Sequence, residues 1–205
     1  MATETSQSLD HGRSGDARPT DLLIVGTLGG GGIHHYVDEL SSRLPDSLSV
    51  SVYDMETPST GSGLFWLLRS VLASLWALLK FPFRRRPDIV HVHASHRFSF
   101  YRATPYVLFA AHVWRRPVVL HIHGSSFDEF AEADDALVRW LQGAVFGASD
   151  RVVVLSEYWR DLLSPIVPAA KLEVLPNAVD PAAYEPAFGD DPPHPVLVSN
   201  LIARK

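Results

Sequence analysis

The chain has 205 residues, 46% of them hydrophobic and 20% charged, with a formal net charge of −5 and no cysteine. This composition is typical of a folded globular protein, and the length allows one full domain and the start of a second. Without cysteine there are no disulfides and no thiolate metal sites, and a net negative charge without a recognition motif argues against nucleic-acid binding.

The first 20 residues are polar and contain no apolar segment. They predict a disordered tail and exclude a secretory signal, which needs an apolar core. No clean stretch of about 20 apolar residues follows, so we expect no transmembrane helix.

Short apolar runs, rich in β-branched residues, alternate with longer amphipathic segments. The runs predict strands at 22–25, 48–53, 88–92, 117–122, 151–155 and 171–176, and helices are expected at 33–44, 64–80, 101–114, 132–147 and 157–164. This alternation is typical of a doubly wound, Rossmann-like parallel α/β sheet, in which ligands bind at the carboxyl ends of the strands. The loops after residues 25, 93, 123 and 155 are therefore expected on one rim.

The domain organisation follows from shifts in composition. We assign the Rossmann-like domain to residues 21–180 and a linker, rich in Pro, Asp and Ala, to 181–194. The apolar run that opens residues 195–205 predicts the first strand of a second domain, cut off after that strand. A last edge strand of the same domain is the alternative.

Four glycines, Gly29 to Gly32, stand between the first strand and the first helix. Glycine lets a ligand approach the backbone closely, and a helix amino terminus favours a phosphate. The run is neither a P-loop, which needs Gly-Lys-Ser/Thr, nor a convincing dinucleotide fingerprint. It predicts phosphate or sugar contact, with a flexible turn as the alternative.

Two of the predicted strands end in His-x-His, first at His91 and His93 and again at His121 and His123. Residues two apart in a strand share a face, so each pair points in one direction. His121 is expected to be a buried, hydrogen-bonded histidine. His123, at the end of its strand, is expected to offer a neutral imidazole to a substrate hydroxyl.

The same His-x-His endings occur in metal-dependent hydrolases, which seat zinc on them. Such sites need further ligands on later strands, where this chain offers Ser156, Glu157 and Asn177. That is a poor metal set, so a metal hydrolase is the less favoured interpretation and no metal site is predicted.

Five segments in order, GGGGIHHYVDEL, PDIVHVHASH, VVLHIHG, ASDRVVVLSE and LEVLPNAVDPAAY, resemble the amino-terminal half of a GT-B-type, family 4 retaining glycosyltransferase. The resemblance covers residues 21–205. It implies two Rossmann-like domains facing a cleft, the first holding mainly the acceptor and the second the nucleotide-sugar donor, and it implies no requirement for a divalent metal.

The resemblance also implies roles for individual residues. His123 matches the family's active-site histidine, and the matched acceptor-side cleft residues are His93, Gly124, Ser156 and Asn177, the last in an Asn-x-Val-Asp turn that ends at Asp180. The matched donor-phosphate residues are Gly31, Gly32 and Lys205.

The sequence departs from the family's pattern at three places. Ala178 replaces the glycine of the Asn-x-Val-Asp turn, and Asn200 replaces a phosphate-binding arginine. The Glu-x7-Glu element that grips the donor sugar would lie beyond Lys205. The chain as given is therefore expected to be half an enzyme and inactive alone, and a non-catalytic acceptor- or partner-binding module is the alternative.

The segment 63–87 is apolar around most of its helical circumference and basic at its end. Residues 64–116 hold nine Lys/Arg and one acidic residue, Asp88. We predict an interfacial helix that docks on anionic lipid, with a core helix packed on two sides as the alternative. The residues predicted at the membrane surface are Trp66, Trp76, Arg84, Arg85 and Arg86. The acceptor is then expected to be lipid-linked or polymer-bound, and the protein to be cytoplasmic and peripheral on the inner face of the plasma membrane.

Overall fold

A computed structural model of the chain describes residues 18–29, 32–55, 63–124 and 127–178. Its centre is a six-stranded sheet with the strand order β2-β1-β3-β4-β5-β6, in which every neighbouring pair is parallel. The strands are β1 (Thr20–Gly26), β2 (Leu48–Asp54), β3 (Ile89–Ala94), β4 (Val118–Ile122), β5 (Arg151–Val154) and β6 (Leu172–Val174). The predicted doubly wound parallel sheet is confirmed, and each of the six strands predicted within residues 21–180 is present.

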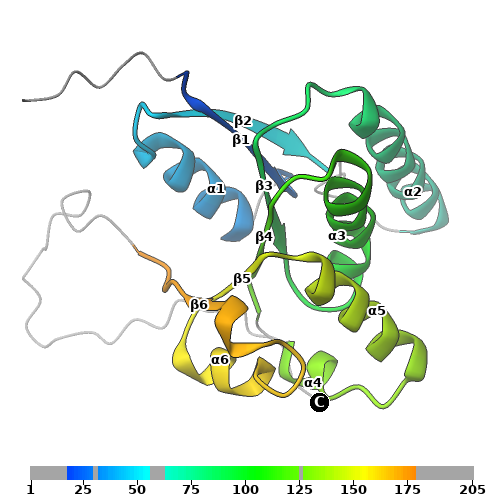
Figure 1. Cartoon of the computed structure of the whole chain (residues 1–205). Helices are drawn as coiled ribbons and strands as arrows, with labels where there is room; N and C mark the ends of the chain where they lie inside the picture. Colours follow the sequence, from blue (N-terminus) through cyan, green and yellow to red (C-terminus); the bar gives the residue numbers. More distant parts are fainter. Residues whose placement is uncertain (1–17, 30–31, 56–62, 125–126, 179–205) are drawn as a thin grey trace, which may run out of the picture.

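Helices cover both faces of this sheet (Figure 1). They are α1 (Gly32–Arg43), α2 (Gly63–Lys80), α3 (Phe98–Phe109), α4 (Phe127–Ala131), α5 (Ala136–Ala148) and α6 (Glu157–Leu163). Because the chain moves from β1 outward to β2 and then back across the sheet to β3, right-handed crossovers place α1 on one face and α2, α3 and α5 on the other. The chain thus reverses direction beside β1, where such folds bind ligands.

Two helices differ from the predicted ones. The predicted helix at 101–114 begins earlier, at Phe98, and after Phe109 it widens into a π-helical turn, Ala110–Trp114. A short helix, α4, lies before the range predicted as a helix at 132–147, and a second helix, α5, corresponds to that range from Ala136 onward. The second begins after Asp135, whose carboxylate accepts hydrogen bonds from the backbone N–H groups of Leu137 and Val138, and this amino-terminal cap fixes the break between the two helices.

Alternation along the strands divides the core in two. On β3, for example, Val90 and Val92 face the larger core, under α3 and α5, whereas His91 and His93 face the side of α1. The smaller core is built around Leu22, Ile24 and Val37, between β1 and α1. Beyond this small core, the α1 face of the sheet carries His91 and His93 on β3 and His121 on β4.

Arg18, just before β1, contacts the start of a neighbouring strand. The Arg18 side chain donates to the Asp88 carboxylate at 2.9 Å, which joins the start of β1 to the start of β3. The predicted linker at 181–194 and the predicted strand after it lie outside the described residues.

Candidate functional site

The carboxyl ends of the parallel strands form one rim, as predicted. The loop after β1 is held there by the Asp54 carboxylate at the end of β2, which accepts a hydrogen bond from the backbone N–H of Leu28 at 3.1 Å. The loop after β4 is tied to its neighbour because the N–H of His123 donates to the carbonyl of Ala94, at the end of β3, at 2.7 Å. Both loops therefore start from fixed positions on the sheet.

Four histidines from β3 and β4 gather beneath this rim on the α1 face. His93 stands beside His121 in the strand register, and His91 and His123 lie two residues away on the same face. The interior of a parallel sheet is ordinarily filled by Val, Ile and Leu, as Ile24, the register neighbour of His91, illustrates. Packing alone does not require histidine at these positions.

The four imidazole rings are in mutual contact. Ring centroids lie 4.2 Å apart for His121 and His123, 4.3 Å for His91 and His93, and 5.1 Å for His93 and His121. One side-chain hydrogen bond links the two His-x-His endings, between His93 Nδ1 and His123 Nε2 at 2.8 Å. The ring of Tyr36, from α1, closes over the group with its centroid 4.9 Å from His123 and 5.0 Å from His121.

Burial keeps this cluster uncharged. Desolvation lowers the pKa of His123 to about 4, and desolvation together with the charge of His123 lowers the pKa of His91 to about 4. The pKa of His121 falls to about 2 and that of His93 lies well below its usual range, in both cases through burial first and the neighbouring imidazoles second. The neutral His123 expected from the sequence agrees with these shifts, because all four rings are unprotonated at pH 7.

Several ring nitrogens of the cluster have no hydrogen-bond partner among the described residues. These atoms are His91 Nε2, His93 Nε2 and both nitrogens of His121. The prediction that His121 is buried is confirmed, since it is fully inaccessible, but the hydrogen bond expected for it is absent from the described part of the chain. An unsatisfied buried polar atom costs about 1–3 kcal/mol, so the cluster carries a cost that a bound group would remove.

Three of these histidines are close enough to share a metal ion. One ring nitrogen from each of His91, His93 and His121 lies within 4.8 Å of the other two. From the sequence we expected any further metal ligands to come from later strands. In the structure the two His-x-His endings themselves bring three potential ligands together.

Two more of the predicted cleft residues follow β5 and β6. Ser156 is the amino-terminal cap residue of α6 and is half-buried, without a side-chain capping bond. Asn177 is exposed, three residues beyond β6. Gly32 begins α1, and a Cβ built on it would meet no atom within 4 Å, which leaves open space at this helix terminus. Gly31, Asp180 and Lys205 lie outside the described residues.

Gly124, directly after His123, is in close contact with two helices. A Cβ at this position would lie 2.8 Å from Cβ of Phe127 in α4 and 3.3 Å from the indole of Trp159 in α6. Glycine therefore allows the end of β4 to approach these helices, and this sets the position of the backbone that carries His123.

A second surface is formed by α2. An ordinary amphipathic helix buries its large apolar side chains, whereas α2 exposes them. Its small residues face the protein: Ser70 and Ala77 are buried, and the carbonyl of Ala77 accepts a hydrogen bond from the Tyr53 hydroxyl at 2.5 Å. Its large apolar residues face outward, among them Phe65, which is 81% exposed. We call this the α2 outer surface; it comprises Leu64, Phe65, Leu67, Leu68, Val71, Leu72, Leu75, Trp76 and Leu79.

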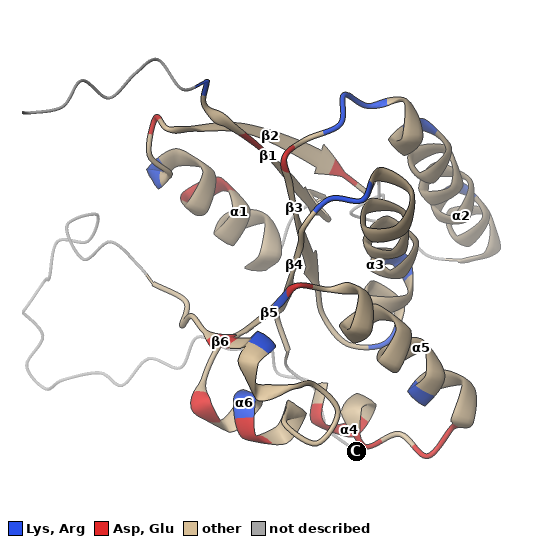
Figure 2. Ribbon diagram, in the orientation of Figure 1, with Lys and Arg blue, Asp and Glu red and all other residues tan. Residues whose placement is uncertain are grey.

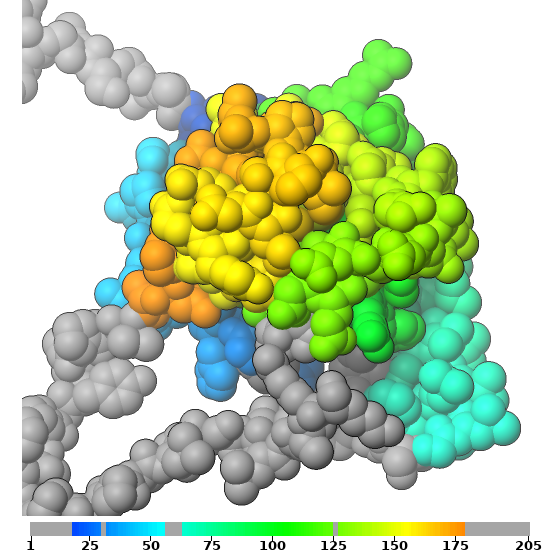
Figure 3. Space-filling model, turned by 90° about the horizontal axis from the view of Figure 1, so that it is seen from below, coloured from blue at the N-terminus to red at the C-terminus, as the bar shows by residue number. Residues whose placement is uncertain are grey.

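The α2 outer surface lies at the margin of the domain (Figure 3) and has cations along it. Figure 2 shows basic residues on α2, on the loop from α2 to β3 and on α3, whereas the acidic residues of α4 and α6 lie elsewhere. Arg84, Arg85 and Arg86 are all exposed, and Arg85 pairs with Asp21 at 3.1 Å. Of the two tryptophans predicted here, Trp76 is exposed, whereas Trp66 is half-buried.

The segment Gly63–Phe83 is long and apolar enough to cross a membrane, judged by length and composition alone. The expectation that the chain has no such segment is therefore wrong by this measure. In the folded domain one side of this helix packs on the protein through Ser70 and Ala77. The large apolar side chains on its opposite side are exposed.

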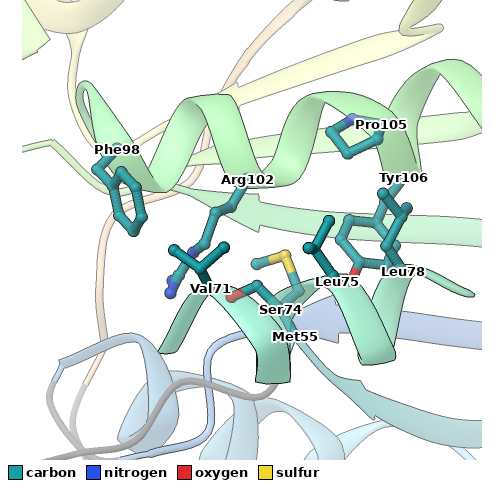
Figure 4. A pocket seen from close by; sticks show the side chains of 9 residues that line it. All are labelled: Met55, Val71, Ser74, Leu75, Leu78, Phe98, Arg102, Pro105 and Tyr106. Carbon is teal, nitrogen blue, oxygen red and sulfur yellow. The ribbon is translucent and has the colours of Figure 1, made fainter. Parts of the chain in front are cut away.

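An apolar cavity of about 240 Å³ lies between α2 and α3 (Figure 4). Val71, Leu75 and Leu78 line it from α2, and Phe98 and Pro105 line it from α3, with Met55, Ser74 and Tyr106 completing the wall. Arg102 is the charged residue of the lining, and its guanidinium lies 5.3 Å from the ring centroid of Phe98. Burial lowers the pKa of Arg102.

The structure adds residues that the sequence did not single out. Tyr36 is one of them. Its position about one turn after the glycine run, next to the buried Val37 in α1, could have indicated that it lies near the site. The contact between the rings of His91 and His121, with centroids 5.6 Å apart, was not predicted either, because it depends on the strand register. The cavity beside Arg102 depends on the packing of two helices and had no sequence signal.

The sheet order, the crossover at β1 and the ligand-binding rim define a Rossmann-like α/β domain with a histidine-lined site. Residues 30–183 match the sequence profile of Glycosyltransferase Family 4, and the chain belongs to this family. The family predicted from the sequence is confirmed. No curated protein matches the chain.

Among solved structures, the chain is similar to a crystal structure of Arabidopsis thaliana UGT89C1 complexed with UDP-L-rhamnose. The sequences are 14% identical, the TM-score is 0.48, and the match covers 82% of this chain. The chain spans 55% of the length of that protein.

Proposed function

We propose that the protein carrying this domain transfers a sugar from a nucleotide-sugar donor to an acceptor with retention of configuration. The observation that carries the proposal is the neutral His123, hydrogen-bonded to His93 at the carboxyl ends of β4 and β3, within a domain of glycosyltransferase family 4. A neutral imidazole both donates and accepts a hydrogen bond. His123 therefore orients a hydroxyl of the reacting sugar without adding charge to the site.

The donor's phosphates are held at the glycine run. The amino terminus of α1 presents free backbone N–H groups and a partial positive charge, and the open space at Gly32 gives a phosphate access to it. Gly31 and Lys205 belong to the same proposal. Because these groups offset the phosphate charge, the transfer step needs no divalent metal.

The test measures transfer by the natural protein. A panel of labelled nucleotide sugars is offered together with a lipid extract as acceptor, and the configuration of the new glycosidic bond is read by NMR. We expect retention, transfer that persists in EDTA, and a loss of kcat of about 10²-fold or more in His123→Ala. His112→Ala is the matched control, since His112 is an exposed histidine of the same domain. An inverted product, or full activity in His123→Ala, would overturn the proposal.

We further propose that the acceptor is lipid-linked and that the protein is peripheral on the inner, anionic face of the plasma membrane. The α2 outer surface and its adjoining arginines support this, since an apolar helix face beside cations fits an anionic interface. The apolar cavity between α2 and α3 supports it too, because a lipid chain fits its lining (Figure 4). Each cation near such a surface contributes about 1 kcal/mol.

Co-sedimentation with vesicles that contain anionic lipid tests this docking. The variant R84Q/R85Q/R86Q is expected to lose the salt-sensitive part of binding. The control variant R139Q/R151Q/R160Q removes the same charge from exposed arginines on α5, β5 and α6 and is expected to bind like the wild type. Absence of binding by the wild-type protein, or equal losses in the two variants, would contradict membrane docking.

A further inference from the structure

The buried histidine cluster has a feature that the proposed transfer reaction does not use. Orienting a sugar hydroxyl requires His123 and its partner His93, yet His91 and His121 also point to the same place. His121 is fully buried with both ring nitrogens unpaired among the described residues, and Nε2 of His93 is likewise buried and unpaired. Each of these unpaired nitrogens is a potential lone-pair donor directed into the protein.

We propose that His91, His93 and His121 form a binding site for a first-row transition metal ion, with Zn²⁺ as the ion that fits best. Three imidazoles with a fourth position left open make a common zinc coordination set, with Zn–N distances of about 2.0–2.1 Å. In a tetrahedral site two ligand nitrogens of one zinc ion therefore lie about 3.3–3.4 Å apart. The three nitrogens here lie within 4.8 Å of one another, so side-chain rotations that bring them closer by up to about 1.5 Å complete the site.

The hydrogen bond from His93 supports the assignment. Metal-bound histidines ordinarily donate their second ring N–H to a neighbouring acceptor, and this fixes the tautomer that binds the ion. When His93 Nδ1–H donates to His123 Nε2, 2.8 Å away, the lone pair of His93 Nε2 is left for the metal. His123 thus serves the site as the partner of a ligand.

The surroundings also suit a metal ion. Imidazole metal ligands must be unprotonated, and burial keeps these three neutral at pH 7. His91 is half-buried, whereas the other two are buried, so an ion reaches the site from the side of His91. The ring of Tyr36 lies against those of His93 and His121.

The site goes beyond the proposed transfer function and does not depend on it. Its test therefore measures binding. Untagged protein is freed of metal with a chelator and titrated with Co²⁺, which substitutes for Zn²⁺ and reports a tetrahedral site by visible absorption. We expect one Co²⁺ per chain, displaced by Zn²⁺ and not by Mg²⁺, because Mg²⁺ prefers oxygen ligands.

Two variants identify the ligands. His91→Gln removes a half-buried ligand and is expected to weaken Co²⁺ binding by more than 100-fold. His123→Gln removes the hydrogen-bond partner of a ligand and is expected to weaken it by about 10–100-fold. His112→Gln is the control and should bind like the wild type, since His112 is exposed on the other side of the sheet.

Two measurements need no variant. Zn²⁺ at about 100-fold over its Kd is expected to raise the Tm by about 5–10 °C. In a spectrum of the imidazole nitrogens, three of the ten histidines should shift on addition of Zn²⁺. No Co²⁺ absorption at millimolar metal, unchanged affinity in folded His91→Gln, or shifts confined to exposed histidines would each overturn the site. Ordered water would then be the partner of the buried nitrogens.

Discussion

His93 Nδ1 lies 2.8 Å from His123 Nε2, and this single hydrogen bond joins the side chains at the ends of two adjacent strands. His93 is fully buried, whereas His123 is half-buried and stands at the rim. The fully buried ring therefore holds the half-buried one in place. Any role of His123 toward a substrate depends on the residue behind it, which makes His93 a positioning residue.

Replacing His93 by leucine should therefore lower kcat while leaving the acceptor KM nearly unchanged. A misplacement of about 1 Å costs on the order of 10²-fold, and we expect a loss of that size. Initial rates over a range of acceptor concentrations separate the two constants. His93→Asn, which retains a polar side chain, should recover part of the loss. An equal change in KM and kcat for the leucine variant would instead indicate a general loss of structure.

Gly124→Ala is expected to destabilise the domain by about 1–3 kcal/mol, the usual cost of overpacking. The added methyl group would lie 2.8 Å from Cβ of Phe127, an atom fixed to the backbone of α4, so one of the two elements must move. Urea unfolding followed by circular dichroism measures the change.

Gly143→Ala is the matched control for this substitution. Gly143 lies in α5, and a Cβ there would meet no atom within 4 Å. Alanine should therefore stabilise the helix by about 0.5–1 kcal/mol through its lower conformational entropy in the unfolded chain. If both variants lost the same stability, the close contact at Gly124 would not be the cause.

Membrane docking through the α2 outer surface predicts a difference between two exposed tryptophans. Trp76 in α2 is 58% exposed and Trp140 in α5 is 65% exposed. Anionic vesicles that contain brominated lipid should quench the fluorescence of Trp76 and leave that of Trp140 unchanged. The Trp76→Phe and Trp140→Phe variants assign the signal. Quenching that survives in Trp76→Phe and vanishes in Trp140→Phe would place the contact on α5 instead.

The strands were the most predictable part of the fold. The run VVLHI lies at β4 where the sequence placed it, because a short β-branched segment between Pro117 and Gly124 has few alternatives. The short helix α4 and the later start of α5 were not predicted, since the start of α5 depends on the cap formed by Asp135, and an Asp within an apolar periodicity is a weak signal.

The candidate site was predicted in part. The two His-x-His endings fixed which residues share a face within each strand. The register that places His93 beside His121 is a property of the pairing of β3 with β4, and no single strand determines it. For the same reason the sequence identified α2 as unusually apolar but left open which side of it packs on the sheet; the burial of Ser70 and Ala77 resolves this.

Buried neutral histidines make the stability of the metal-free domain depend on pH. In the unfolded chain a histidine has a pKa near 6.5, whereas in the folded domain the pKa of His91 and that of His123 are lowered to about 4 and that of His121 to about 2. Between these values the unfolded state binds more protons. The free energy of unfolding should therefore be at its plateau above pH 6.5 and fall as the pH drops toward 4.

Each such histidine contributes a slope of up to about 1.4 kcal/mol per pH unit within this window. Urea unfolding in EDTA at pH 7.5, 6 and 5 measures the slope. His121→Leu replaces a titrating ring by an apolar side chain and should make the slope shallower, whatever its effect at pH 7.5. His112→Leu, at an exposed position, should leave the slope as in the wild type. A stability independent of pH between 7.5 and 5 would show that these histidines accept protons in the folded domain as readily as in the unfolded chain.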